Sequence, residues 1–332
     1  MKPGVKAHTK EKRCLKGVAV FAAILPMLLA ALFAAAVGPG PVRAQDSKPQ
    51  TPGPPKFLNM VHQELKPGRI WEYDELETSI ARIYAREAIP VYWIELESIA
   101  GPSEVLYLNL FDSAEDLAKS EKSLSASFSA HPELAQTQDR LLQENTTSGT
   151  TVLAVRRDDM GYRANTIDFS QMRALRLSTI FAHPGYERAF TETEWALAEA
   201  SQKANARTPW AVYEVIGGLP EPAFVIVTPM QSLGEIDDLF DAGQAMKKAD
   251  AGALDQRLQE LARIAYGTTD TRLFVVGPKM SHVAKETAAT DPDFWSPAVI
   301  APPPSAAGKP EKPSARPAAA PASPASPPAP KP

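Results

Sequence analysis

The chain contains an internal repeat: two stretches with the same order of segments and turns lie roughly 117 to 121 residues apart. The first stretch runs from residue 57 to 157 and the second from 172 to 283. Each begins with a short alternating segment that ends in a Pro-Gly turn, at Gly68 in the first copy and Gly185 in the second, and each then enters a helical pattern. We therefore expect two units of the same fold.

Hydrophobic periodicity assigns the same elements to both copies. In the first copy it predicts strands at 57–65, 91–98, 104–111 and 150–156, a helix at 70–88, and a helical region at 113–144 that is broken near His131-Pro132. In the second it predicts strands at 175–182, 210–216, 224–228 and 272–276, a helix at 186–204 and two later helical pieces. The order is β-α-β-β-α-β twice, which is the ferredoxin-like plan in the α+β class.

In both copies the second strand starts at a proline and carries a glutamate. The segments are 90–95 and 209–214, and alignment on Pro90 and Pro209 makes Glu95 and Glu214 equivalent.

The order of elements, the Pro-Gly turn before the first helix and the length of about 100 residues per unit resemble the dimeric α/β-barrel superfamily, which includes the NIPSNAP family and the antibiotic-biosynthesis-monooxygenase-like domains. The resemblance covers residues 57–283. It implies a fused tandem repeat, in which two ferredoxin-like units pack sheet to sheet as a single-chain barrel. Some members of the superfamily bind haem, and others oxidise aromatic substrates without a metal.

The N-terminal residues 1–44 have the pattern of an export signal: basic residues, the apolar run from Val18 to Val37, and Val42-Arg43-Ala44 before Gln45. Cleavage after Ala44 is expected, although about 20 apolar residues also suffice for an uncleaved anchor. Cleavage leaves no stable membrane anchor and predicts a secreted or periplasmic protein. Residues 45–56 are expected to be a Pro-rich linker, 158–171 a linker between the repeats, and 284–332 a disordered Pro/Ala-rich tail.

Charge and cysteine content exclude several classes of function. Removal of residues 1–44 takes seven of the 35 Lys and Arg and one of the 39 Asp and Glu, which leaves a net charge near -10. An acidic chain without a basic patch does not indicate a nucleic-acid partner. Because the single cysteine, Cys14, precedes the apolar run, the mature chain has no disulfide and no thiol nucleophile.

Alternation along the strands separates two faces of each sheet. An aliphatic set that includes Leu58, Leu106, Leu175 and Val225 is expected to lie under the helices. A mixed aromatic and polar set is expected to line the barrel and to bind a ligand, with these members as candidate ligand-binding residues: Asn59, Trp93, Glu95, Tyr107, Arg176, Trp210 and Glu214. The alternative is that this set fills the interface between the sheets, with Arg176 neutralising a glutamate.

Glu95 and Glu214 are the candidate catalytic residues. If they approach each other inside the barrel, repulsion and desolvation raise one pKa and supply an acid or base; otherwise they orient a ligand or serve structure. The four histidines of the mature chain, at 62, 131, 183 and 282, form no paired metal-ligand spacing, so no metal is expected and haem is a minor alternative.

Three functions are consistent with the sequence. The first is an exported α/β-barrel protein that binds a small apolar or aromatic molecule. The second is a cofactor-independent monooxygenase or a haem-handling enzyme of the same barrel type. The third is a structural or interaction module that meets an envelope partner through the tail.

Overall fold

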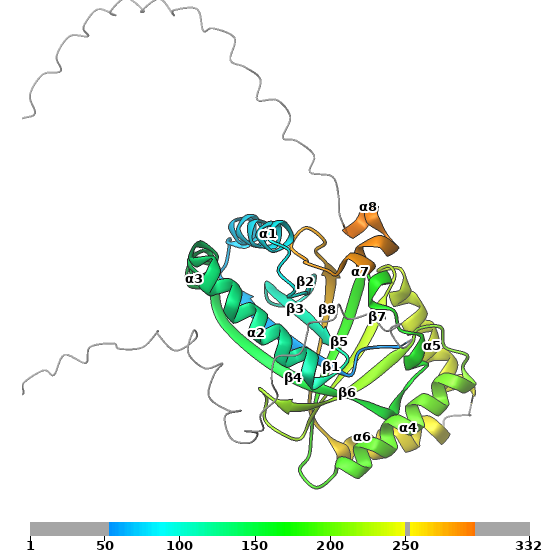
Figure 1. The fold of residues 1–332 in the computed structure, drawn as a ribbon. Coiled ribbons are helices and arrows are strands. Elements are labelled where there is room, and N and C mark those ends of the chain that lie inside the picture. Colours follow the sequence, from blue (N-terminus) through cyan, green and yellow to red (C-terminus); the bar gives the residue numbers. More distant parts are fainter. Residues whose placement is uncertain (1–52, 250–252, 296–332) are drawn as a thin grey trace, which may run out of the picture. The chain divides into compact units, whose positions relative to one another are not determined.

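A computed structural model of the protein describes residues 53–249 and 253–295 (Figure 1). The first half contains β1 (Phe57–Leu65), α1 (Ile70–Arg86), β2 (Ile94–Ser98), β3 (Glu104–Phe111), α2 (Ala114–Ala130), α3 (Pro132–Asn145) and β4 (Thr146–Tyr162). The second half contains β5 (Ala174–Ala182), α4 (Glu187–Lys203), β6 (Trp210–Gly217), β7 (Ala223–Met230), α5 (Glu235–Ala249), α6 (Ala253–Ala265) and β8 (Tyr266–Val276). The predicted order of strands and helices is present in both halves, including the break at His131, which lies between α2 and α3.

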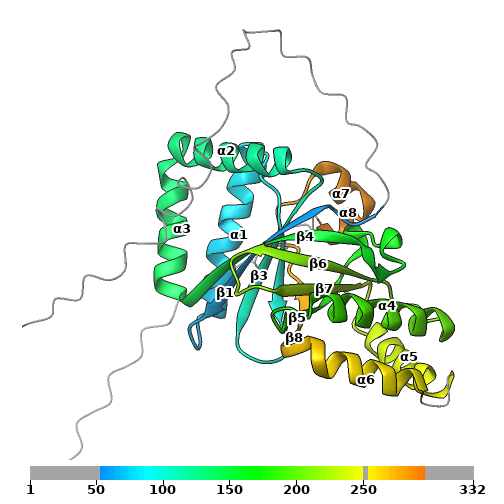
Figure 2. The same cartoon turned by 90° about the horizontal axis from the view of Figure 1, so that it is seen from below.

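The eight strands form one closed antiparallel barrel in the order β1-β3-β2-β8-β5-β7-β6-β4, and β4 pairs with β1 to close it. Each half contributes four neighbouring strands, and the halves meet where β2 pairs with β8 and where β4 pairs with β6. Helices α1 to α3 lie on one side of the barrel and α4 to α6 on the other (Figure 2). Because the barrel is closed, no strand presents a free edge.

The aliphatic face of each sheet lies inside the barrel. Leu58, Leu106, Leu175 and Val225 belong to one buried cluster that draws on both halves. The mixed face lies outside, where Trp93 and Tyr107 pack with side chains of α1, and Trp210 and Ile226 pack with Phe190 of α4. The prediction of which face lines the barrel was therefore wrong. An eight-stranded barrel leaves an interior that side chains alone can fill, so the densely packing aliphatic residues occupy it.

Strand register also corrects the proposed equivalence of Glu95 and Glu214. Val61 of β1 and Ser178 of β5 match, because they precede the equivalent turn residues Gly68 and Gly185 by the same number of residues. Val61 lies opposite Tyr107 and Ser178 lies opposite Ile226, so Tyr107 and Ile226 match as well. Glu95 lies opposite Tyr107, whereas the residue opposite Ile226 is Val212. The ladder therefore matches Glu95 with Val212, and the equivalence was wrong by two residues. Pro90 and Pro209, on which the alignment rested, precede the strands, where no ladder fixes the chain.

Two predicted segment boundaries differ from the structure. The linker expected at 158–171 is structured, since β4 continues to Tyr162 and two short 3-10 turns follow, η1 (Ala164–Thr166) and η2 (Phe169–Gln171). The tail expected from 284 begins with two helices, α7 (Lys285–Thr290) and α8 (Pro292–Trp295), and Trp295 belongs to the inner cluster. A large buried aromatic side chain supplies enough apolar contact to order this segment.

The predicted signal, most of the first linker and the tail beyond 295 lie outside the described residues. Within the described part of the chain, no helix combines the length and the apolar character needed to cross a membrane.

Candidate functional site

A cavity of about 570 Å³ lies between the outer face of the second-half sheet and the helices that cover it. Strands β5 to β8 form its floor, and α4 and α5 form its walls. The lining is mainly apolar, and it includes Trp210, Ile226, Leu239, Phe240 and Met246. This volume lies in the range of small-molecule sites, and an apolar lining with few polar groups is typical of them.

The cavity exists because the second half has smaller side chains where the first half has bulky ones. Where the first half has Tyr107, the matching position in the second half has the smaller Ile226. In the helices, α1 and α4 have the same length and follow the same turn, so Tyr84 of α1 matches Ser201 of α4. Both smaller residues line the cavity, whereas Tyr84 and Tyr107 fill the corresponding layer of the first half.

Arg176 is the one charged residue among the described residues that line this cavity. Its side chain is half-buried and makes no hydrogen bond or ion pair with residues 53–249 or 253–295. Burial lowers the pKa of the Arg176 guanidinium below its usual range. A guanidinium remains charged in proteins, so a half-buried one without a partner among the described residues is available to pair with an anion.

Thr208 supplies a second unsatisfied polar group. It lines the cavity, and its buried Oγ1 has no hydrogen-bond partner among the described residues. Buried hydroxyls are normally hydrogen-bonded, so this one is available to a bound molecule. The hydroxyl of Ser201, by contrast, already donates to the carbonyl oxygen of Leu197 at 2.8 Å.

Haem, which the sequence resemblance raised as an alternative, needs an axial ligand from the lining. Met246 lines the cavity, but haem proteins that use methionine as an axial ligand pair it with histidine, and none of the described lining residues is His, Cys or Tyr. The described residues therefore do not fit a haem site here. Across 53–249 and 253–295, no group of three or more His, Cys, Asp or Glu side chains is placed to hold a metal ion.

The predicted residues Glu95 and Tyr107 lie in the corresponding layer of the first half, in a buried polar cluster under α1. Tyr73 donates to Gln63 Oε1 at 2.9 Å, and its hydroxyl also contacts that of Tyr107. Burial raises the pKa of Glu77 to about 8, while a hydrogen bond from Tyr107 opposes the shift. This cluster keeps carboxyl groups protonated near neutral pH.

Glu95 is fully buried, and neither of its carboxyl oxygens has a hydrogen-bond partner in the described part of the chain. Burial raises its pKa well above the usual range, and the nearby carboxylates of Glu97 and Glu77 raise it further. The segment after β8 covers this residue closely, since a Cβ added at Gly277 would lie 2.0 Å from Glu95 Oε2. Glu95 is therefore enclosed by protein atoms, and it lines neither this cavity nor the smaller one described below.

Trp93 is held by the same segment. Its indole N–H donates to the carbonyl oxygen of Met280 at 2.7 Å, and its ring meets Tyr84 edge to face at 4.9 Å. Trp93 therefore serves packing between β2 and α1, and no described cavity exposes it.

The predicted residues do not converge on one site. Arg176 and Trp210 line the same cavity, Trp93, Glu95 and Tyr107 lie under α1, and Asn59 is on the outer face of β1. Glu214 is half-exposed and accepts a hydrogen bond from Arg157 at 3.0 Å. Since β2 and β6 lie on opposite sides of the barrel, Glu95 and Glu214 do not form a catalytic pair.

Sequence reasoning missed the helical lining and the polar groups Ser201 and Thr208. Comparison of the helices would have shown Tyr84 against Ser201, a loss of volume in one copy alone. No comparable signal identified Thr208, whose missing partner is a property of the tertiary structure.

No protein-family model and no curated protein matches the sequence. Solved structures with a similar arrangement include an anthrone oxidase-like protein, with 15% identity and a TM-score of 0.43 over 67% of this chain and 92% of that one. A monooxygenase-like protein from Lactobacillus acidophilus NCFM has 8% identity and a TM-score of 0.41 over 67% of this chain and 94% of that one. Chlorite dismutase from Candidatus Nitrospira defluvii has 10% identity and a TM-score of 0.41, over 67% and 92%. At these values the likeness does not extend to activity.

Proposed function

We propose that the protein binds a small, largely apolar molecule that carries an acidic group, in the cavity between the second-half sheet and helices α4 and α5. The observation that carries this proposal is the unpaired Arg176 guanidinium in the lining of a 570 Å³ apolar cavity. A carboxylate or sulfonate pairs with a guanidinium through two parallel hydrogen bonds, which fixes the orientation of the molecule as well as its position.

The remaining lining residues indicate the chemical character of the rest of the bound molecule. Trp210, Ile226 and Phe240 offer apolar and aromatic contact, and Thr208 offers one hydroxyl. No described lining residue is Asp, Glu, His, Cys, Lys or Tyr, so the lining holds no acid or base, and its Ser and Thr hydroxyls have no base in the lining to activate them as nucleophiles. The arrangement therefore favours binding over an oxygenase or other enzymatic activity.

The proposal also covers the architecture of the protein and its export. Two runs of neighbouring strands, β4-β1-β3-β2 and β8-β5-β7-β6, support two ferredoxin-like units fused in tandem as a NIPSNAP-like barrel. The basic, apolar and small-residue order of residues 1–44 supports export with Gln45 as the first residue. Mass spectrometry of the exported protein tests this start, and a mass that retains residues 1–44 contradicts it.

Two fluorescent probes of similar shape test the binding site. 8-Anilinonaphthalene-1-sulfonate carries an anionic group, and N-phenyl-1-naphthylamine has the same aromatic body without it. Wild-type protein is expected to bind the sulfonate more tightly. In Arg176→Gln the sulfonate should lose about tenfold or more in affinity, because both charged hydrogen bonds to the guanidinium are removed, and the neutral probe should be unchanged.

A second variant tests the cavity itself. Ile226→Tyr introduces the residue that the first half has at the matching position, so it should reduce the binding of both probes while the protein stays folded. Arg188→Gln is the matched control for charge, because Arg188 is exposed on α4 and pairs with Glu192. Equal binding of both probes to wild type and to Arg176→Gln would overturn the proposal.

A further inference from the structure

A separate cavity of about 160 Å³ lies inside the barrel, on the inner face of the strands. Its floor is apolar and comes from both halves, with Met60, Leu106, Leu177, Val225 and Phe274 among the lining residues. Apolar cavities of about 150 Å³ hold a benzene ring. The space therefore suits one small ring and not the larger molecules that the outer cavity accommodates.

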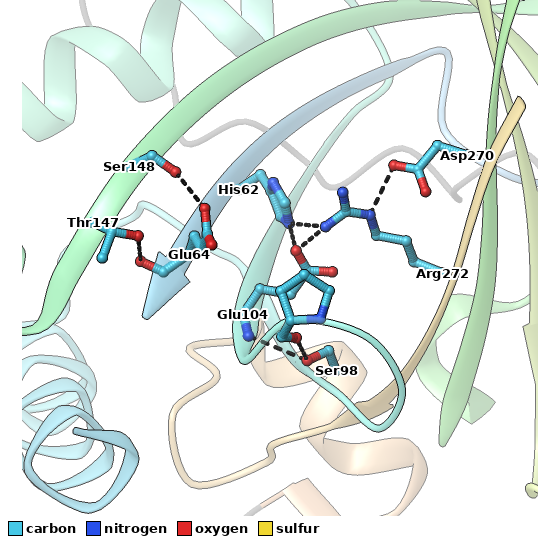
Figure 3. Close-up of polar contacts among 9 residues, drawn as sticks. His62, Glu64, Ser98, Glu104, Thr147, Ser148, Asp270 and Arg272 are labelled. Atoms are coloured by element: carbon cyan, nitrogen blue, oxygen red, sulfur yellow. Dashed lines mark hydrogen bonds and ion pairs between the residues drawn. The ribbon is translucent and has the colours of Figure 1, made fainter. Parts of the chain in front are cut away.

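Polar side chains gather at one end of this cavity, which we call the barrel mouth and define by His62, Glu104, Asp270 and Arg272. Figure 3 shows His62 of β1, Glu104 of β3 and Arg272 of β8 pointing toward one another. His62 Nε2 lies 2.6 Å from Glu104 Oε2, and Arg272 NH1 also contacts this oxygen. Arg272 Nε donates to Asp270 Oδ2 at 2.9 Å. His62, Asp270 and Arg272 line the cavity.

The barrel mouth is rich in acceptors. Two carboxylates face the single charge of Arg272, so an anionic ligand gains little there. His62 Nε2 contacts the carboxylate of Glu104, and in the imidazole tautomer that donates through Nε2 the other nitrogen, Nδ1, is an acceptor. Nδ1 has no partner in the described part of the chain. Glu104 Oε1 is likewise buried without a partner there. The polar group of a matching ligand must donate a hydrogen bond.

Solvent reaches this end of the barrel. The Asp270 side chain is about half-exposed, at 48%, while Glu104 beneath it is 1% exposed. The polar end of the cavity is therefore open to solvent at Asp270, whereas Glu104 is enclosed.

From this geometry we infer that the barrel mouth and the cavity behind it form a second binding site, which takes a benzene-sized ring that carries a hydroxyl group, with His62 as its hydrogen-bond acceptor. Glu104 acts as a positioning residue, because its contact with Nε2 fixes the tautomer of His62. The site is separate from the outer cavity and, unlike the outer cavity, it does not favour an anionic group.

Calorimetric titration with phenol, benzene and benzoate tests this inference, in the full chain that carries Ile226→Tyr so that the outer cavity is closed. Phenol should bind about tenfold more tightly than benzene, as expected for one hydrogen bond in a site that excludes water, and benzoate should bind more weakly than phenol. In His62→Phe, which keeps a ring at this position, the preference for phenol over benzene should disappear. Glu104→Gln keeps the volume and should reduce the same preference.

Two further variants separate the two sites. Val225→Leu fills the inner cavity and should weaken both phenol and benzene, whereas Ile226→Tyr, which closes the outer cavity, should leave phenol binding unchanged. The inference is overturned if phenol and benzene bind equally once Ile226→Tyr has closed the outer cavity, if benzoate binds that variant best, or if Ile226→Tyr abolishes phenol binding.

Discussion

At the scale of single residues, the buried carboxyl groups are the most consequential feature. Glu77 of α1 and Glu194 of α4 occupy matching helix positions, and each contacts a tyrosine hydroxyl, Tyr107 for Glu77 and Tyr266 for Glu194. Burial raises the pKa of Glu77 to about 8 and that of Glu194 to about 7. At pH 7 Glu77 is therefore mostly protonated in the folded chain and Glu194 about half protonated, and both ionise when the chain unfolds.

The consequence is a stability that falls as pH rises. The folded pKa of Glu77 lies above its ordinary value of 4.5, so its contribution is complete below pH 4.5 and is lost as pH rises through 8. We expect the melting temperature to decrease between pH 5 and pH 8. Between pH 5 and pH 8, the free energy of unfolding of Glu77→Gln should fall by less than that of wild type, with a difference on the order of 2–4 kcal/mol. A wild-type melting temperature that rises over this range, in scans at matched ionic strength, would contradict the assignment.

Glu95 and Glu214, the candidate catalytic residues of the sequence analysis, should respond differently to replacement by glutamine. Glu95→Gln removes a buried group whose charged form is disfavoured, so it should raise the melting temperature at pH 8 and change little at pH 5. Glu214→Gln removes a half-exposed ion pair with Arg157 and should cost no more than about 1 kcal/mol. Chemical denaturation at both pH values measures the two effects. A loss of stability in Glu95→Gln at pH 8 would show that its carboxylate is paired.

At the scale of elements, α8 is short and yet anchors the chain after the second half. Trp295 belongs to the inner cluster, and its indole N–H donates to the carbonyl oxygen of Ser170 at 3.0 Å. Arg173 pairs with Asp291 at 2.5 Å and stacks on the ring of Phe294 at 3.7 Å. These contacts attach α7 and α8 to the turn that joins the two halves.

Trp295→Ala should therefore lower the free energy of unfolding by about 3 kcal/mol, the usual cost of removing a buried aromatic side chain. Trp71→Ala is the matched control, because Trp71 is 77% exposed on α1 and should change stability by no more than about 0.5 kcal/mol. Urea denaturation compares the two variants. Equal small effects would mean that Trp295 does not pack in the inner cluster in solution.

At the scale of the whole molecule, the barrel interior belongs to both halves. The inner cluster combines strands β1 to β4 with β5 to β8, so either half alone exposes an aliphatic sheet face to water. Such a face is large enough to drive association.

A fragment of residues 53–162 should therefore self-associate in isolation, and addition of a fragment of residues 163–295 should convert it to a one-to-one complex. Gel filtration with light scattering measures both masses. A fragment that remains a monomer and unfolds cooperatively would show that one half buries its core without the other.

The sequence by itself determined the order and kind of the elements, because hydrophobic periodicity, Pro-Gly turns and the break at His131 are local signals. The repeat also predicted two similar halves, and the resemblance to the α/β-barrel superfamily implied the closed barrel. Alternation along the strands placed Arg176 and Trp210 on the same sheet face, and both line the outer cavity, outside the barrel and not inside it as predicted.

Tertiary structure alone decided which face of the strands lies inside the barrel. Alternation separates two faces but does not say which one meets helices, and the closed barrel reserved its narrow interior for aliphatic side chains. Register, which depends on pairing between distant strands, decided that Glu95 and Glu214 do not correspond. Cavities arise where packing between such distant segments falls short, so the space beside Arg176 and the barrel mouth at His62 became visible only in three dimensions.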